Sequence, residues 1–185
     1  AEKDGNRMVM LDGVDIVYRI LEDSLTPWTS LTTPFDVQSK VLLTRSVESV
    51  QSLSITLDGD MVYRWDVTRT TDEEKSTEDK PAYTYTVTAN GKEITYENFQ
   101  QYYKRMIQIQ LLEPTKEEPQ GDPDLTITYE YYGDTGKPVD VVKFYEISDR
   151  RYLVTVNGTV SGIVASTNVQ TFLNFTPKIL VDEEL

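Results

Sequence analysis

Cysteine and histidine are both absent from the 185 residues of the chain. Their absence excludes thiolate and imidazole zinc sites, iron–sulfur clusters, disulfides, cysteine nucleophiles and histidine general bases. Basic residues are fewer than acidic ones: the chain has 18 Lys and Arg and 31 Asp and Glu, which gives a net charge of −13. Phosphate groups and anionic lipids are bound by basic surfaces, so this balance argues against nucleic-acid and membrane-surface partners. We expect no enzymatic activity, no cofactor and no metal.

Long apolar runs are missing as well. No stretch of about 18 apolar residues exists, so the sequence predicts no transmembrane helix. A charged segment followed by a short apolar run, which is typical of a signal peptide, is also missing. The chain starts at Ala1 and opens with polar residues 1–7, and we expect it to be a piece of a longer chain. Its length fits one domain, or one domain and a fraction.

Apolar and polar residues alternate in many segments. The clearest are residues 52–57, 61–67, 83–88, 125–131 and 152–156. A period of two residues predicts strands with one buried face, as in antiparallel sheets. Four Asx-Gly pairs lie between such segments: Asp12-Gly13, Asp58-Gly59, Asn90-Gly91 and Asn157-Gly158. These pairs favour type I′ turns, so they predict tight hairpins.

One segment has the period of a helix. From residue 95 to residue 112 the apolar residues recur at steps of three and four, with Thr95 placed as N-cap and Pro114 just beyond the end. Shorter helices are predicted at 166–174 and near 24–31, and loops at 70–80 and 113–124. The predicted fold class is α+β: antiparallel β hairpins, or a meander, with one long helix (about 95–112) packed on one face and one or two short helices.

The two ends of the chain resemble each other. MVML-DG-VDIVYRI near the start and YLVTV-NG-TVSGIV near the end both predict strand, Asx-Gly turn and strand, and each precedes a segment that favours a helix. We therefore expect residues 1–43 to be the C-terminal tail of a preceding, truncated repeat unit. Residues 44–185 are expected to form one complete α+β repeat unit.

Three stretches carry a resemblance to a known family. They are VYRILEDSLTPWTSLTTPFDVQSKVLL, VESVQSLSITLDGDMVYRW and FYEISDRRYLVTVNGTVSGIV. With them the chain resembles, from about Val14 to Leu180, the bacterial family of unknown function catalogued as "forty-three forty". The acidic segment 70–80 departs from the family pattern as an insertion.

The resemblance implies a location and a role. Members of the family look like envelope proteins with an N-terminal membrane anchor and an extracytoplasmic β-rich repeat. Several lie beside ABC transporter components, including those of gliding-motility systems. For this chain the resemblance implies a non-enzymatic module tethered outside the bacterial cytoplasmic membrane by an anchor that lies outside the sequence. Its partner would be an envelope protein, such as ABC transporter subunits, and its role would be protein–protein contact or structural support.

Acidic runs and serines are the remaining candidates for chemistry. The acidic runs are residues 72–74 with 78–79, and residues 117–118 with 122 and 124. Carboxylate oxygens bind Ca²⁺, but neither run has the spacing of an EF-hand, and solvated acidic loops are the favoured interpretation. No Gly-x-Ser-x-Gly motif and no phosphate-binding glycine loop is present.

Aromatic residues are plentiful, with 12 Tyr, 5 Phe and 2 Trp. Aromatic faces stack on sugar rings, so the alternative function is a glycan-binding or cell-wall-binding module that uses exposed Tyr and Trp. The candidate binding residues are Trp28, Tyr102, Tyr131, Tyr132 and Tyr145. Tyr is also a good strand residue whose hydroxyl reaches water from a half-buried face, and the sequence leaves this choice open.

Overall fold

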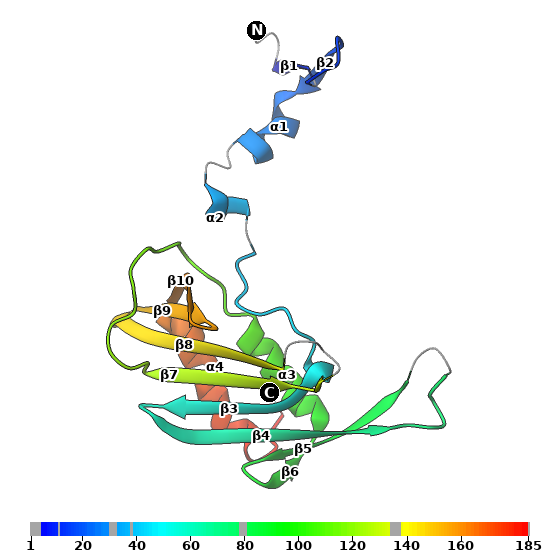
Figure 1. The fold of residues 1–185 in the computed structure, drawn as a ribbon, viewed down its shortest axis with the longest axis vertical. Helices are drawn as coiled ribbons and strands as arrows, with labels where there is room; N and C mark the ends of the chain where they lie inside the picture. Colours follow the sequence, from blue (N-terminus) through cyan, green and yellow to red (C-terminus); the bar gives the residue numbers. More distant parts are fainter. Residues whose placement is uncertain are drawn as a thin grey trace. The chain divides into compact units, whose positions relative to one another are not determined.

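The computed structural model describes residues 5–10, 12–29, 33–37, 39–77, 81–133 and 138–184. The chain divides into two compact units, residues 1–39 and residues 40–185 (Figure 1). Strands hold 46% of the residues and helices 22%. The predicted α+β class is therefore wrong, and the protein is mostly β. Strand residues outnumber helical residues about two to one, because a single sheet of eight strands forms the body of the second unit.

The first unit is a hairpin followed directly by helices. Its elements are β1 (Asn6–Met10), β2 (Val17–Leu21), α1 (Glu22–Thr29) and α2 (Pro34–Val37). β1 and β2 pair antiparallel, with Met10 opposite Val17. The prediction of a tight turn at Asp12-Gly13 is wrong, because residues 11–16 separate the two strands. Gly13 has a φ of 77°, but Asp12 does not adopt the positive φ that a type I′ turn also needs at its first position.

The second unit contains the eight-stranded sheet. Its elements are η1 (Val47–Ser49), β3 (Val50–Leu57), β4 (Asp60–Thr71), β5 (Tyr83–Ala89), β6 (Lys92–Ile94), α3 (Tyr96–Ile107), β7 (Leu125–Tyr131), β8 (Val139–Ser148), β9 (Arg151–Val156), β10 (Thr159–Ala165) and α4 (Ser166–Ile179). The strand order is β10-β9-β8-β7-β3-β4-β5-β6, and every neighbouring pair is antiparallel. The predicted tight turns at Asp58-Gly59, Asn90-Gly91 and Asn157-Gly158 are confirmed, with positive φ at each residue.

The sheet consists of two halves with the same order of elements. β3-β4-β5-β6-α3 and β7-β8-β9-β10-α4 are each a four-stranded meander followed by a helix, and they meet where β3 pairs with β7. The halves also share a turn detail. Asn90 donates its backbone N–H to the carbonyl of Arg64 (2.7 Å), and its Oδ1 accepts the Arg64 N–H (2.8 Å). Asn157 makes the same two bonds to Val141, at 2.8 and 2.9 Å. The second unit thus contains an internal repeat that the sequence did not reveal.

Both helices lie on one face of the sheet (Figure 1). α3 buries Phe99, Tyr102, Tyr103 and Met106, and the Tyr102 ring packs 5.1 Å from that of Trp65. The two helices are joined by a hydrogen bond of 2.5 Å between the Tyr102 hydroxyl and Thr176 Oγ1. Burial of these apolar side chains under both helices forms the core of the unit.

Both predicted helix ends differ from the structure. α3 ends at Ile107 instead of 112, because the next residues bond to other parts of the unit. Leu111 donates its N–H to the Lys40 carbonyl and Leu112 to the Ile163 carbonyl, each at 2.7 Å. The predicted helix at 166–174 continues to Ile179, because burial of the Ile179 side chain stabilises the last turn.

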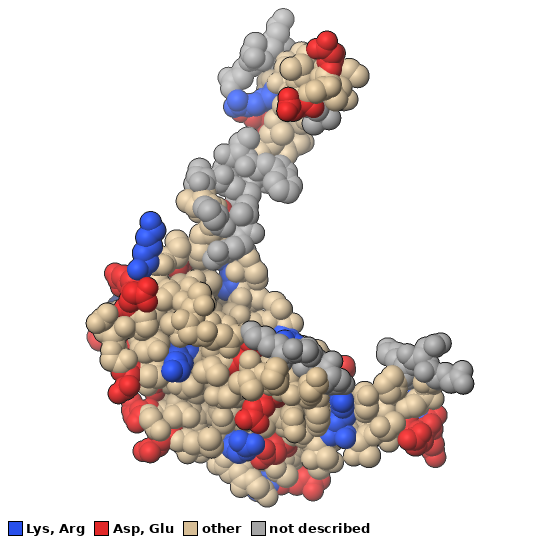
Figure 2. All heavy atoms as spheres, viewed as in Figure 1, with Lys and Arg blue, Asp and Glu red and all other residues tan. Residues whose placement is uncertain are grey.

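The opposite face of the sheet is polar across β3, β4 and β7. Arg64 donates to Asp66 Oδ1 (Nε, 2.9 Å), Ser52 donates to Glu130 Oε2 (2.7 Å), and Arg64 lies 4.0 Å from Glu130. The hydrogen bond to Asp66 raises the pKa of Arg64. In Figure 2 acidic and basic side chains are intermixed over this unit and form no basic stripe on the visible face.

Candidate interaction sites

Three of the five candidate aromatic residues are buried. Tyr102 is fully buried, Tyr131 is 2% exposed and Tyr145 is 9% exposed. Rings enclosed to this degree have no free face for a sugar. Trp28 lies in α1, and its side chain is outside the described residues. Tyr132 is half-buried, and its hydroxyl donates to the Val67 carbonyl (2.6 Å).

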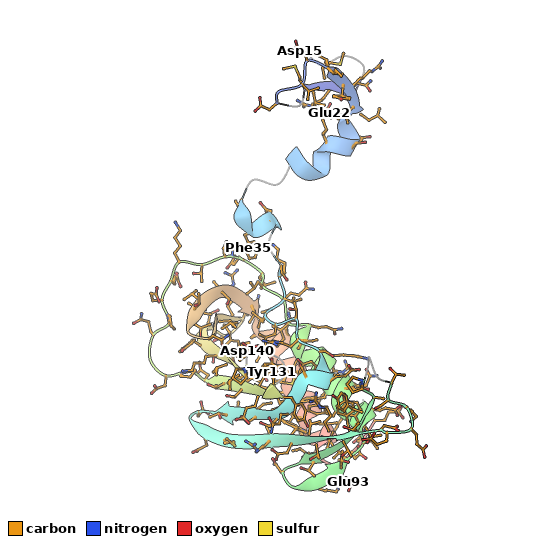
Figure 3. The ribbon with its side chains drawn as sticks, turned by 45° about the vertical axis from the view of Figure 1, so that its right-hand side comes forward. Asp15, Glu22, Phe35, Glu93, Tyr131 and Asp140 are labelled. Carbon is orange, nitrogen blue, oxygen red and sulfur yellow. The ribbon has the colours of Figure 1, made fainter. Side chains whose placement is uncertain are left out.

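A buried polar cluster surrounds Asp140 (Figure 3). This carboxylate is 3% exposed and accepts a hydrogen bond from Asn157 Nδ2 (2.8 Å). Arg45 Nε lies 3.8 Å from it, and the Arg45 guanidinium lies 4.9 Å from the centre of the Tyr131 ring. Tyr103 donates its hydroxyl to the Arg45 carbonyl (3.0 Å). The cluster therefore ties the segment before η1 to α3, β7, β8 and the β9–β10 turn.

The tyrosines of this cluster keep their protons. Burial raises the pKa of Tyr103 to about 12, and burial also raises the pKa of Tyr131 well above its ordinary range. A phenol with so high a pKa is a poor proton donor or acceptor near neutral pH, where general acid–base groups need matched pKa values. The contacts of the cluster therefore hold neighbouring segments together and support a structural role.

The described residues of the acidic runs show no arrangement for a metal. Within the described part of the chain, no group of three or more Asp or Glu residues is placed to hold an ion. Asp72 pairs with Lys75 (3.0 Å), whose hydrogen bond lowers the pKa of the Asp72 carboxyl. Asp124 accepts the N–H of Glu146 (2.6 Å). Glu78 and Asp79 lie outside the described residues.

A second set of tyrosines comes from the start of β5, the start of α3 and the residue after β7; Figure 1 shows the β4–β5 hairpin that carries two of them. The Arg69 guanidinium lies 4.3 Å from the Tyr83 ring centre and 4.2 Å from that of Tyr132. Tyr85 stacks on Tyr96, with ring centres 4.5 Å apart and planes 9° apart. The alternation of residues 83–88 placed Tyr83 and Tyr85 on one face, but it carried no signal for the contacts with Arg69, Tyr96 and Tyr132.

The outer edge of β5 is covered over part of its length. β4 pairs with all seven residues of β5, from Tyr83 to Ala89, whereas β6 pairs only with Val87, Thr88 and Ala89. Among the described residues, no strand lies beside residues 83–86 on this edge. An open depression of about 530 Å³ lies against it. Its lining comes from β5, β6, the start of α3 and the chain after α4: Tyr85, Thr86, Glu93, Ile94, Thr95, Tyr96, Glu97 and Asp182.

Asp182 fixes one wall of this depression. Its Oδ1 accepts hydrogen bonds from the Thr95 N–H (2.9 Å), the Thr95 hydroxyl (2.9 Å) and Asn98 Nδ2 (2.7 Å). The Thr95 side chain makes no cap bond of its own, so the carboxylate from beyond α4 caps α3. The hydrogen bond from the Thr95 N–H is the largest cause that lowers the pKa of Asp182. The carboxylates of Asp182 and of exposed Glu93 and Glu97 make the depression acidic (Figure 3 labels Glu93).

The hairpin of the first unit presents apolar side chains to solvent. The register places Asn6 and Arg19 on the same face of the hairpin as four apolar residues, Met10, Val17, Met8 and Leu21. These four residues, the apolar hairpin face, are 62%, 60%, 58% and 62% exposed in that order. Val9 and Ile20 on the other face are half-buried. Neither strand alone indicated which face would be left uncovered.

Comparison of the chain with models of protein families, with curated proteins and with solved structures gives no match. In the described part of the chain, no helix combines the length and the apolar character needed to cross a membrane.

Proposed function

We propose that the chain is a non-enzymatic interaction module of a membrane-anchored bacterial envelope protein, located outside the cytoplasmic membrane. The observation that carries the proposal is the apolar hairpin face, formed by Met8, Met10, Val17 and Leu21. The resemblance to the "forty-three forty" family supports the location and the partner class, an ABC-type envelope system.

The apolar hairpin face is costly when it is left in water. A two-stranded hairpin on its own is marginally stable, and large apolar side chains gathered on one face mark interaction sites on soluble proteins. These residues are about 60% exposed, so each side chain gains about 1–2 kcal/mol when a partner covers it fully. A protein partner with an apolar surface therefore fits this face better than a polar ligand does.

The test uses the full-length natural protein in membranes of its bacterial host. We expect it to fractionate with membranes, to be accessible from outside the cytoplasm and to co-purify in detergent with envelope partners. Met10→Lys places a charge in the apolar hairpin face and should abolish co-purification. Met61→Lys is the matched control, because Met61 is 60% exposed on β4. A soluble full-length protein without partners, or equal loss in both variants, contradicts the proposal.

Cell-wall glycan binding is the second candidate. Partly exposed Tyr83 and Tyr85 on β5, with Tyr132 just after β7, favour it, because these residues retain some accessible surface. Binding to purified peptidoglycan should be lost in Tyr83→Ala and retained in Tyr18→Ala, whose residue is 41% exposed in the other unit. Equal binding by both variants removes this candidate.

A further inference from the structure

We propose that the outer edge of β5, at residues 83–86, binds an extended basic segment of a partner protein as an added strand. The proposal rests on the interaction role inferred above and adds to it a second surface and the chemistry of its partner. It depends on backbone groups and acidic side chains of the sheet unit, and the apolar hairpin face takes no part in it.

The turn between β5 and β6 fixes which backbone groups face this edge. Ala89 and Lys92 flank the two-residue Asn90-Gly91 turn, so they form the hydrogen-bonded pair next to it. Hydrogen-bonded and non-bonded positions alternate along a strand, so Val87 also bonds to β6, opposite Ile94. The same alternation directs the N–H and C=O groups of Tyr85 and Tyr83 outward. These groups lie beyond the end of β6, where an added strand would accept and donate hydrogen bonds.

In the second half of the sheet, the corresponding edge of β9 is covered by a neighbouring strand. There β10 pairs with β9 from Arg151 to Val156, along the whole of the inner strand. β6 has three residues, whereas β10 has seven. An added strand in line with β6 and antiparallel to β5 would give the first half the same coverage. The depression of about 530 Å³ adjoins β5 at Tyr85 and Thr86 and provides open space at that part of the edge.

Charge selects a basic partner. Glu93 and Glu97 are exposed at the depression, and Asp182 adds a third carboxylate held by Thr95 and Asn98. The positive charge of Lys92 is one of the causes that lower the pKa of Asp182. The whole chain carries a net charge of −13, which attracts a cationic segment and repels an acidic one. Hydrogen bonds along the edge give affinity, and Lys or Arg side chains at alternate positions reach the carboxylates.

The experiment uses the whole chain and a short acetylated, amidated peptide in which Lys alternates with Val and Thr. In an amide NMR titration we expect the largest shifts at residues 83–86. N-methylation of the peptide amides that face β5 should abolish binding, and N-methylation of the alternate amides should leave it intact. A peptide with Glu in place of Lys should not bind. Absence of binding by the basic peptide, or binding that ignores the position of N-methylation, overturns the proposal.

Charge variants separate recognition from adsorption to an acidic protein. Glu93→Gln combined with Glu97→Gln should lower the affinity for the basic peptide by about three- to tenfold at low salt, with a smaller effect at high salt. Glu117→Gln combined with Glu118→Gln removes the same charge from the loop before β7 and should leave affinity unchanged. Equal weakening by both pairs overturns the assignment to β5. Because Met10→Lys should not alter peptide binding, failure here is distinguishable from failure of the proposed envelope role.

Discussion

The two halves of the sheet share their order of elements but differ at the last strand. β10 is seven residues long and its outer side is met by the chain itself, since Glu113 pairs with Ile163. At Gly162 the fit is so close that a Cβ would lie 2.8 Å from the Glu113 carbonyl oxygen. β6 is three residues long, and the chain turns into α3 directly after it. The same topology thus produces one edge closed by its own chain and one edge that is partly open.

The largest expected effect tests whether the halves unfold together. Trp65 in the first half and Phe144 in the second are fully buried. Trp65→Ala and Phe144→Ala should each lower the free energy of unfolding by about 3–5 kcal/mol. Because β3 and β7 join the halves in one sheet, each variant should show a single urea transition for residues 40–185. Separate transitions for the two halves, followed by amide NMR signals of β5 and of β8, would contradict this coupling.

A smaller effect should distinguish the two equivalent turns. Asn90→Gly and Asn157→Gly keep the positive φ of the turn but remove the side-chain bonds to Arg64 and Val141. Asn157 also donates to buried Asp140, so its loss leaves a buried carboxylate with fewer donors. We expect a loss of about 2 kcal/mol for Asn157→Gly and about 0.5–1 kcal/mol for Asn90→Gly. Urea unfolding measures both, and equal losses would show that Asp140 does not need Asn157.

The smallest effect concerns the cap that links the halves at α3. Hydrogen bonds from Thr95 and Asn98 lower the pKa of Asp182 below its ordinary value of 3.8. Because the folded pKa lies below the unfolded one, the stabilisation is complete above pH 3.8 and is lost as the pH falls through the folded pKa. Asp182→Asn should therefore lose part of the wild-type difference in unfolding free energy between pH 6 and pH 2. The exposed control Asp60→Asn should keep it, and an identical pH dependence in both variants would contradict the cap.

Local patterns predicted the strands better than their arrangement. Alternation placed residues 125–131 in a strand, and Asp58, Asn90 and Asn157 were recognised as turn residues because a type I′ turn depends on two neighbouring residues alone. The pairing of β3 with β7 joins segments far apart in the chain and has no local signal. Asp12-Gly13 has the same local sequence signal, yet its strands pair farther from the turn. The end of α3 was missed because Leu111 bonds to Lys40, a tertiary contact.

The candidate site was harder to predict than the fold. The sequence identifies Tyr102 and Tyr131 as aromatic, but their exposure depends on which face of the sheet the two helices cover. The edge beside Tyr83 and Tyr85 arises from the shortness of β6, which is set by where α3 begins. Sequence alternation gives the face of a side chain, whereas exposure of backbone groups depends on the neighbouring strand.

Residues 108–124, between α3 and β7, form the connection at which this molecule can be divided. It is the covalent connection between two halves that are already held by the β3–β7 ladder and by the contact of Tyr102 with Thr176. A protease cut within residues 116–120, which lie outside every strand and helix, would leave both sets of contacts in place. We therefore expect the two halves, synthesised as separate fragments, to recombine into one noncovalent sheet.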